Sequence, residues 1–176
     1  MLHIDHKSLR SSAEQVEGSV PALVYPYQVG LTGGALGGLA MIAVAIMFGI
    51  VSERGFWLPV NLIGATLIRD LQGASLGTLS QFNVAALIAG LLLHTAISMG
   101  LGFVFAVLLP TLPGSPLIWS LPIGMLLWSL AGLIALPLLN PIMVGTVDVP
   151  SFLIAHLGYG LVLGGWIART PKILAE

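Results

Sequence analysis

Charged side chains are scarce in this chain of 176 residues: only 7% are Asp, Glu, Lys or Arg, while 57% of the residues are hydrophobic. The mean hydropathy of +1.02 is far above that of a water-soluble domain of this size. The composition therefore indicates an integral membrane protein. The six basic residues are scattered and the net charge is −1, so there is no basic patch with which to bind nucleic acid.

Cysteine is absent, which excludes disulfides, thiolate metal sites and cysteine-ligated iron–sulfur clusters. The seven carboxylates all lie in tails or loops, and the spacing brings no serine, histidine and acid together as a catalytic triad. His3 and His6 have a spacing typical of metal ligands but lack a third ligand, so we expect a solvated tail there. The sequence predicts no enzyme and no metal site.

Long apolar runs predict four transmembrane helices, each long enough to cross a hydrocarbon core of about 30 Å. The predicted parts are a polar arm at 1–26, spans at 27–51, 83–109, 117–139 and 150–168, and a short tail at 169–176. The expected fold is an all-α membrane bundle of four helices. Four spans place both termini on one side, and the excess of Lys and Arg there predicts the cytoplasmic side of a bacterial inner membrane.

The segment between the first two spans is amphipathic. Val60, Ile63 and Leu67 fall on one helical face, and Asn61 and Arg69 lie largely opposite. This pattern predicts a helix over about 59–72 that lies in the membrane interface, with Pro59 in its first turn. A re-entrant half-helix within 57–82 is the alternative, and it would need a protein wall or a water cavity around it.

Small residues recur at a spacing of four along three of the spans, which places them on one face of each helix. His94 and His156 are each followed by small residues at +4, +8 and +12, so the pattern occurs twice. Such faces are where membrane helices pack. The predicted packing residues are Gly30, Gly34, Gly38, Gly90, Ser98, Gly102, Gly160 and Gly164. The repeated pattern suggests two related tandem hairpins; chance recurrence in glycine-rich spans is the alternative.

An ionisable residue inside a span marks either a functional site or a buried hydrogen bond, and His94 and His156 are the two such residues here. In one interpretation each imidazole is neutral and donates across the bundle to a hydroxyl or carbonyl, with Thr95, Ser98, Ser129 and Tyr159 as candidate partners. In a second, both are axial ligands of one b-type haem. In a third, they line a proton or solute path, as in a small transporter or channel.

Four stretches resemble a group of small four-span bacterial membrane proteins that accompany respiratory cytochrome oxidases or the alternative complex III. The stretches are Trp57–Leu62, the Asn140–Pro141 turn, Asp148–Phe152, and Tyr159–Gly164 through Ala168–Arg169. The resemblance implies a non-catalytic accessory subunit that contacts membrane lipids and other transmembrane subunits, and it assigns no role to either histidine. We therefore expect an accessory subunit of an electron-transfer complex that has no cofactor of its own, with haem binding as the alternative.

Overall fold

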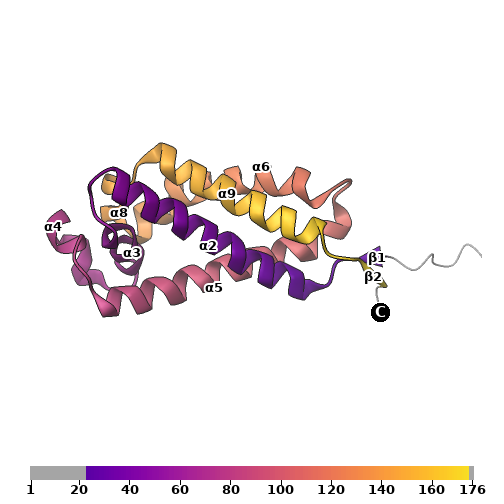
Figure 1. Ribbon diagram of the computed structural model, residues 1–176, viewed down its shortest axis with the longest axis horizontal. Helices are drawn as coiled ribbons and strands as arrows, with labels where there is room; N and C mark the ends of the chain where they lie inside the picture. The colour runs from indigo at the N-terminus through magenta and orange to yellow at the C-terminus, as the bar shows by residue number, and fades with distance from the viewer. Residues whose placement is uncertain (1–22, 175–176) are drawn as a thin grey trace, which may run out of the picture.

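The computed structural model describes residues 23–174. Four of its helical segments are long and apolar enough to cross a membrane: Tyr27–Val51, Val84–Thr111, Pro116–Leu139 and Val149–Ala168. They begin and end within about two residues of the predicted spans. The protein is an all-α membrane bundle (Figure 1). Most of the polar arm, with His3 and His6, lies outside the described residues.

Short polar side chains define where the spanning helices begin. Asn83 accepts the Ala86 amide at 3.0 Å ahead of α5 (Val84–Leu108), and Asp148 accepts the Ser151 amide at 2.9 Å ahead of α9 (Val149–Ala168). Ser115 caps α6 (Pro116–Leu130), whose first residue is a proline. Each cap satisfies an amide that the first turn of a helix leaves unpaired, which matters most where no water is present.

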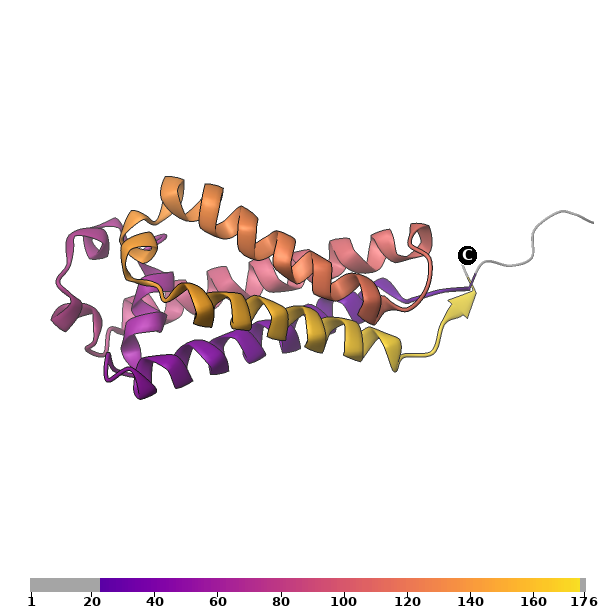
Figure 2. The ribbon, with the colours of Figure 1, turned by 90° about the horizontal axis from the view of Figure 1, so that it is seen from above.

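The helices are arranged as two antiparallel pairs joined through the first span. The helix α2 (Tyr27–Val51) packs along both α5 and α9, and α6 packs along α9 (Figures 1 and 2). The span that contains α6 makes no comparable contact with α2 or α5 within residues 23–174. The first span pairs with the second and the third with the fourth, as two tandem hairpins would.

The two ends of the described chain meet beyond one end of the bundle. The strand β1 (Leu23–Val24) pairs antiparallel with β2 (Ile173–Leu174), with Leu23 opposite Leu174 (Figure 1). An even number of spans and this short ladder place both ends of the described chain on the same side of the membrane.

The predicted helix at 59–72 is wrong in length. The helix α3 covers only Trp57–Gly64, and a 3₁₀ segment, η1 (Arg69–Gly73), and a short helix, α4 (Leu76–Leu79), follow it. Asn61, expected on a polar outer face, is 1% exposed and donates to the carbonyls of Leu79 and Gln81, both at 2.7 Å. This amide ties the loop back onto α3, and residues 57–81, which we call the plug, pack against α5 through α3. Leu58, Leu62, Leu71 and Leu79 form its buried core, while most of its residues after Arg69 are exposed.

A second buried asparagine fixes the plug to the other hairpin. The short helices α7 (Leu136–Leu139) and α8 (Pro141–Thr146) flank Asn140, which is fully buried. Its amide donates to the Leu62 carbonyl at 2.6 Å and to the Thr66 hydroxyl at 2.8 Å, and its oxygen caps Met143 at 3.2 Å. Arg54 and Arg69 add bonds to the carbonyls of Thr146 and Leu139.

The third span is interrupted near its end by a π-helical turn, η3 (Ala131–Ala135), in which the Leu136 amide bonds to the Ala131 carbonyl. Pro137 follows directly. Proline lacks an amide hydrogen and crowds the carbonyl four residues earlier, so a regular α-helix cannot continue through it without loss. In Figure 2 the end of this span that carries the π-helical turn diverges from α5.

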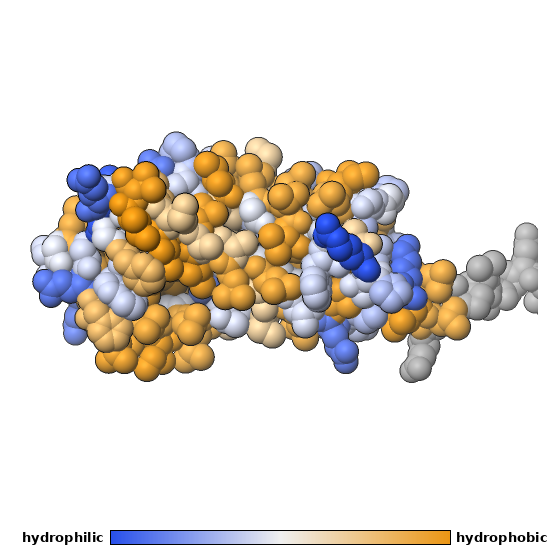
Figure 3. All heavy atoms as spheres, in the orientation of Figure 1, coloured by the Kyte–Doolittle hydropathy of each residue, from blue (hydrophilic) through white to orange (hydrophobic). Residues whose placement is uncertain are grey.

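Apolar side chains cover the middle of the molecular surface. In Figure 3 the hydrophobic residues occupy most of the length of the bundle, and the most hydrophilic residues gather toward its two ends. Large side chains on the outward faces include Leu92, Ile118, Leu133 and Leu138, which are 63–79% exposed. This distribution fits a surface in contact with lipid hydrocarbon.

Candidate functional site

All eight predicted packing residues lie where helices meet. Gly30 and Gly34 face Gly102 and Ser98 across the α2–α5 contact, and Gly38 faces Ser98 and His94. Gly160 and Gly164 both face Ser120 of α6, whereas Gly90 contacts Gly64 of α3. The sequence pattern therefore located the contact faces, although it did not identify α3 as a partner of Gly90. On the other side of α2, Gly33 and Gly37 face Leu163 and Tyr159 of α9.

His94 points from α5 toward the backbone of α2. Its Nε2 lies 3.0 Å from the carbonyl oxygen of Gly38. The approach depends on the missing side chain, because a Cβ on residue 38 would lie 3.4 Å from that nitrogen and only 2.8 Å from the Ser98 Cβ. The small-residue contact thus brings the imidazole to a carbonyl on the neighbouring helix, which is one of the two kinds of partner that the sequence suggested.

His156 bonds within its own helix. Its Nδ1 lies 2.8 Å from the carbonyl oxygen of Phe152, one turn earlier in α9, and the two rings meet edge to face with centroids 4.4 Å apart. The residue is only 6% exposed. The prediction that this histidine donates across the bundle is therefore wrong, because the carbonyl of Phe152 on the preceding turn accepts its hydrogen bond.

These contacts fix the tautomer of both rings. A carbonyl oxygen only accepts, so Nε2 of His94 and Nδ1 of His156 each carry the hydrogen of a neutral imidazole. The other nitrogen of each ring, Nδ1 of His94 and Nε2 of His156, is then a bare acceptor. Neither has a hydrogen-bond partner among residues 23–174.

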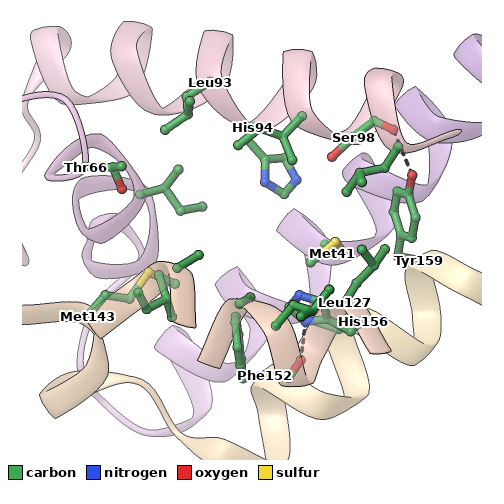
Figure 4. A pocket seen from close by; sticks show the side chains of 18 of the residues that line it. Met41, Thr66, Leu93, His94, Ser98, Leu127, Met143, Phe152, His156 and Tyr159 are labelled. Atoms are coloured by element: carbon green, nitrogen blue, oxygen red, sulfur yellow. Dashed lines mark hydrogen bonds between the residues drawn. The ribbon is translucent and has the colours of Figure 1, made fainter. Parts of the chain in front are cut away.

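Both rings line one cavity of about 440 Å³ that lies between α5 and the span containing α6. We call it the histidine cavity (Figure 4). Its walls are aliphatic and aromatic apart from the two imidazoles and the hydroxyls of Thr66, Ser98 and Tyr159. Ala131, Ile134 and Ala135 of the π-helical turn form part of one wall, and Ile63 and Thr66 of the plug close one end. The cavity lies where this span and α5 make no extensive contact, and the π-helical turn forms part of its wall.

Tyr159 lines the histidine cavity. The residue is 2% exposed, and its hydroxyl donates to the Ser98 carbonyl at 2.7 Å (Figure 4). We expected Tyr159 as a possible partner for a histidine, but its one hydrogen joins α9 to α5 instead. Tyr159 therefore presents no free hydrogen to the cavity, while the hydroxyls of Thr66 and Ser98 donate to no acceptor among residues 23–174.

No group of three or more histidine, cysteine or acidic side chains that could hold a metal ion occurs within the described part of the chain. Two imidazoles can still serve as a pair of axial ligands or as hydrogen-bond acceptors. Sequence reasoning found both histidines but not the cavity between them, because the cavity depends on the π-helical turn and on the plug. No protein-family model, curated protein or solved structure matches this chain.

Proposed function

We propose that the protein is a non-catalytic accessory subunit of a respiratory electron-transfer complex in the bacterial inner membrane, with both termini in the cytoplasm. The observation that carries this proposal is the incomplete packing of the third span. That span, Pro116–Leu139, is the least buried of the four, and among residues 23–174 the one spanning helix it packs along is α9. The resemblance of Trp57–Leu62 and Asp148–Phe152 to companions of respiratory complexes supports the choice of partner.

A helix in a bilayer gains little from burying apolar surface, since lipid chains are equally apolar, but it gains dispersion contacts and specificity from packing against another helix. The small residues of this chain are largely used in internal contacts, so the surplus of glycine-rich packing surface that would attract a partner is modest. On α5 and α9, a Cβ at Gly100 or Gly158 would meet nothing within 4 Å, so these two glycines take no part in the internal contacts. The outward face of the third span is therefore the best candidate for a partner contact.

Site-directed photo-cross-linking tests the proposal, and the absence of cysteine makes single labelling sites simple. A benzophenone probe on Leu133→Cys, which is 79% exposed on the π-helical turn, should cross-link in native membranes to an identified oxidase or complex III subunit. The matched control is Met47→Cys on α2, which is 63% exposed. Adducts with lipid alone at Leu133, or equal adducts at both sites, would contradict the proposal.

A second candidate, a b-type haem protein, is favoured by one observation: His94 and His156 line the same cavity, and each has an unbonded ring nitrogen. His156 has the tautomer usual for an axial ligand, with Nδ1 on a backbone carbonyl and Nε2 free. A reduced-minus-oxidised spectrum of the isolated chain decides between the candidates. An α-band that is lost in both His94→Ala and His156→Ala would establish haem binding; a chain without pigment would remove that candidate.

A further inference from the structure

We propose that the histidine cavity binds a molecule dissolved in the bilayer that is apolar apart from hydroxyl groups, of which a hydroquinone with an alkyl tail is the representative. The site would take the hydroxylated form of such a molecule in preference to its carbonyl form. This inference concerns residues of this chain only, so its test does not depend on the identity of the partner complex.

The two imidazoles offer hydrogen-bond acceptors to the cavity, so they favour a ligand that can donate a hydrogen bond. His156 is 94% buried, its Nδ1 hydrogen is used by Phe152, and its Nε2 presents a lone pair at the cavity wall. His94 presents a second lone pair from the opposite helix pair, because its hydrogen is used by Gly38. The one fully enclosed side-chain polar atom without a partner among residues 23–174 is Oδ1 of Asn61, so the two imidazole nitrogens are open to the cavity. A ligand that brings a hydroxyl hydrogen can donate to one of these nitrogens, whereas a carbonyl ligand has no hydrogen to donate.

The apolar side chains that line the cavity favour a ligand that is itself mostly apolar. Apart from the two rings and three hydroxyl side chains, the lining residues are Leu, Ile, Ala, Met and Phe, and all four membrane-spanning segments contribute to the lining. Lysine, arginine and acidic side chains are missing from the lining. A carboxylate or phosphate head would find no cation here, whereas an uncharged ring or alkyl chain would find contacts throughout.

The volume agrees with a small ring and the first part of a tail. A cavity of about 440 Å³ is within the range of pockets that hold small organic ligands. Phe152 stands edge to face against the His156 ring and forms an aromatic wall beside the free nitrogen. Figure 4 shows both imidazoles projecting from their helices into the space between them. A ring carrying a hydroxyl could therefore donate to one imidazole while packing on aromatic and aliphatic side chains.

Calorimetric titration of the full chain in mild detergent under argon tests the proposal directly. The probes are a decyl-substituted benzohydroquinone and the matching benzoquinone, which share a skeleton and differ in whether the oxygens carry hydrogen. We expect the hydroquinone to bind at least about tenfold more tightly. Equal binding, or tighter binding of the quinone, would overturn the proposal.

Two kinds of variant connect the binding to the cavity. His156→Phe keeps an aromatic ring but removes the acceptor, and it should weaken hydroquinone binding about fivefold while leaving quinone binding unchanged.

Ala135→Phe fills the cavity from the opposite wall without touching either histidine and should abolish binding of both probes. Its matched control, Leu133→Phe, lies on the outward side of the same turn and should bind as the parent does. Unchanged binding in Ala135→Phe would contradict the proposed location.

Discussion

At the scale of single residues, the bundle depends on positions where a missing side chain lets backbones approach. Gly34 is the clearest case, because a Cβ there would collide with the Ser98 carbonyl and lie 3.0 Å from the Met99 Cα. Gly100, on α5, is its opposite: a Cβ there would meet nothing within 4 Å. The two glycines have the same chemistry and opposite environments.

Replacing Gly34 by leucine should separate α2 from α5 and destabilise the protein by at least about 2 kcal/mol, since backbone atoms cannot move aside as a flexible side chain can. Gly100→Leu should leave stability within about 0.5 kcal/mol of the parent. Denaturant titration in detergent micelles, followed by circular dichroism, measures both. Equal effects of the two substitutions would show that packing at Gly34 is not as described.

Asn140 offers a second prediction at this scale. Asn140→Ala removes donors to the Leu62 carbonyl and the Thr66 hydroxyl together with the cap on α8. We expect a loss of about 2–3 kcal/mol in unfolding free energy, because buried polar groups are left unsatisfied. The exposed Gln28→Ala is the control. A loss below about 0.5 kcal/mol in the Asn140 variant would contradict a role in fixing the plug.

At the scale of elements, the long helices follow from the sequence and the short ones do not. Apolar length and the caps at Asn83, Ser115 and Asp148 define the spans without reference to the rest of the fold. The plug could not be predicted in the same way. An amphipathic pattern over 59–72 suggests an interface helix, but the side-chain NH₂ groups of Asn61 and Asn140 donate to carbonyls distant in sequence, which no local pattern reveals.

The π-helical turn leads to a prediction about Pro137. With alanine at 137 an amide hydrogen becomes available, the end of the third span can form a regular α-helix, and the histidine cavity should become smaller. Amide hydrogen exchange at Ala131–Leu136 should slow at least about tenfold. Pro122→Ala, a proline inside α6 without a π-helical turn, should leave exchange at those amides unchanged. Unaltered exchange in Pro137→Ala would mean that the proline does not cause the turn.

At the scale of the whole molecule, the order of spans determines which ends share a side. Tyr25 and Lys172 lie at the end that bears the β1–β2 pair, and Gly77 is exposed in the short helix α4 at the other end (Figure 1). A membrane-impermeant maleimide should label Gly77→Cys in intact cells. Tyr25→Cys and Lys172→Cys should react only after the membrane is opened, since basic residues favour the cytoplasmic side. Labelling of Tyr25→Cys before permeabilisation would contradict this orientation.

The central claim is that small-residue contacts join α2 to α5 and α6 to α9. The histidine cavity lies between α5 and the third span, which do not touch there. Oxidative disulfide formation between paired cysteines measures this most directly, because a disulfide requires Cα atoms within about 7 Å. Gly38→Cys with Ser98→Cys, and Ser120→Cys with Gly164→Cys, should each close, because their Cβ positions lie 2.8 and 2.7 Å apart and the helices need to separate by only about 1 Å to reach the roughly 3.5–4.5 Å between the Cβ atoms of a disulfide. Leu93→Cys with Leu130→Cys, on opposite walls of the cavity, should remain reduced. Rapid closure of the Leu93–Leu130 pair, or failure of the first two pairs, would contradict the account.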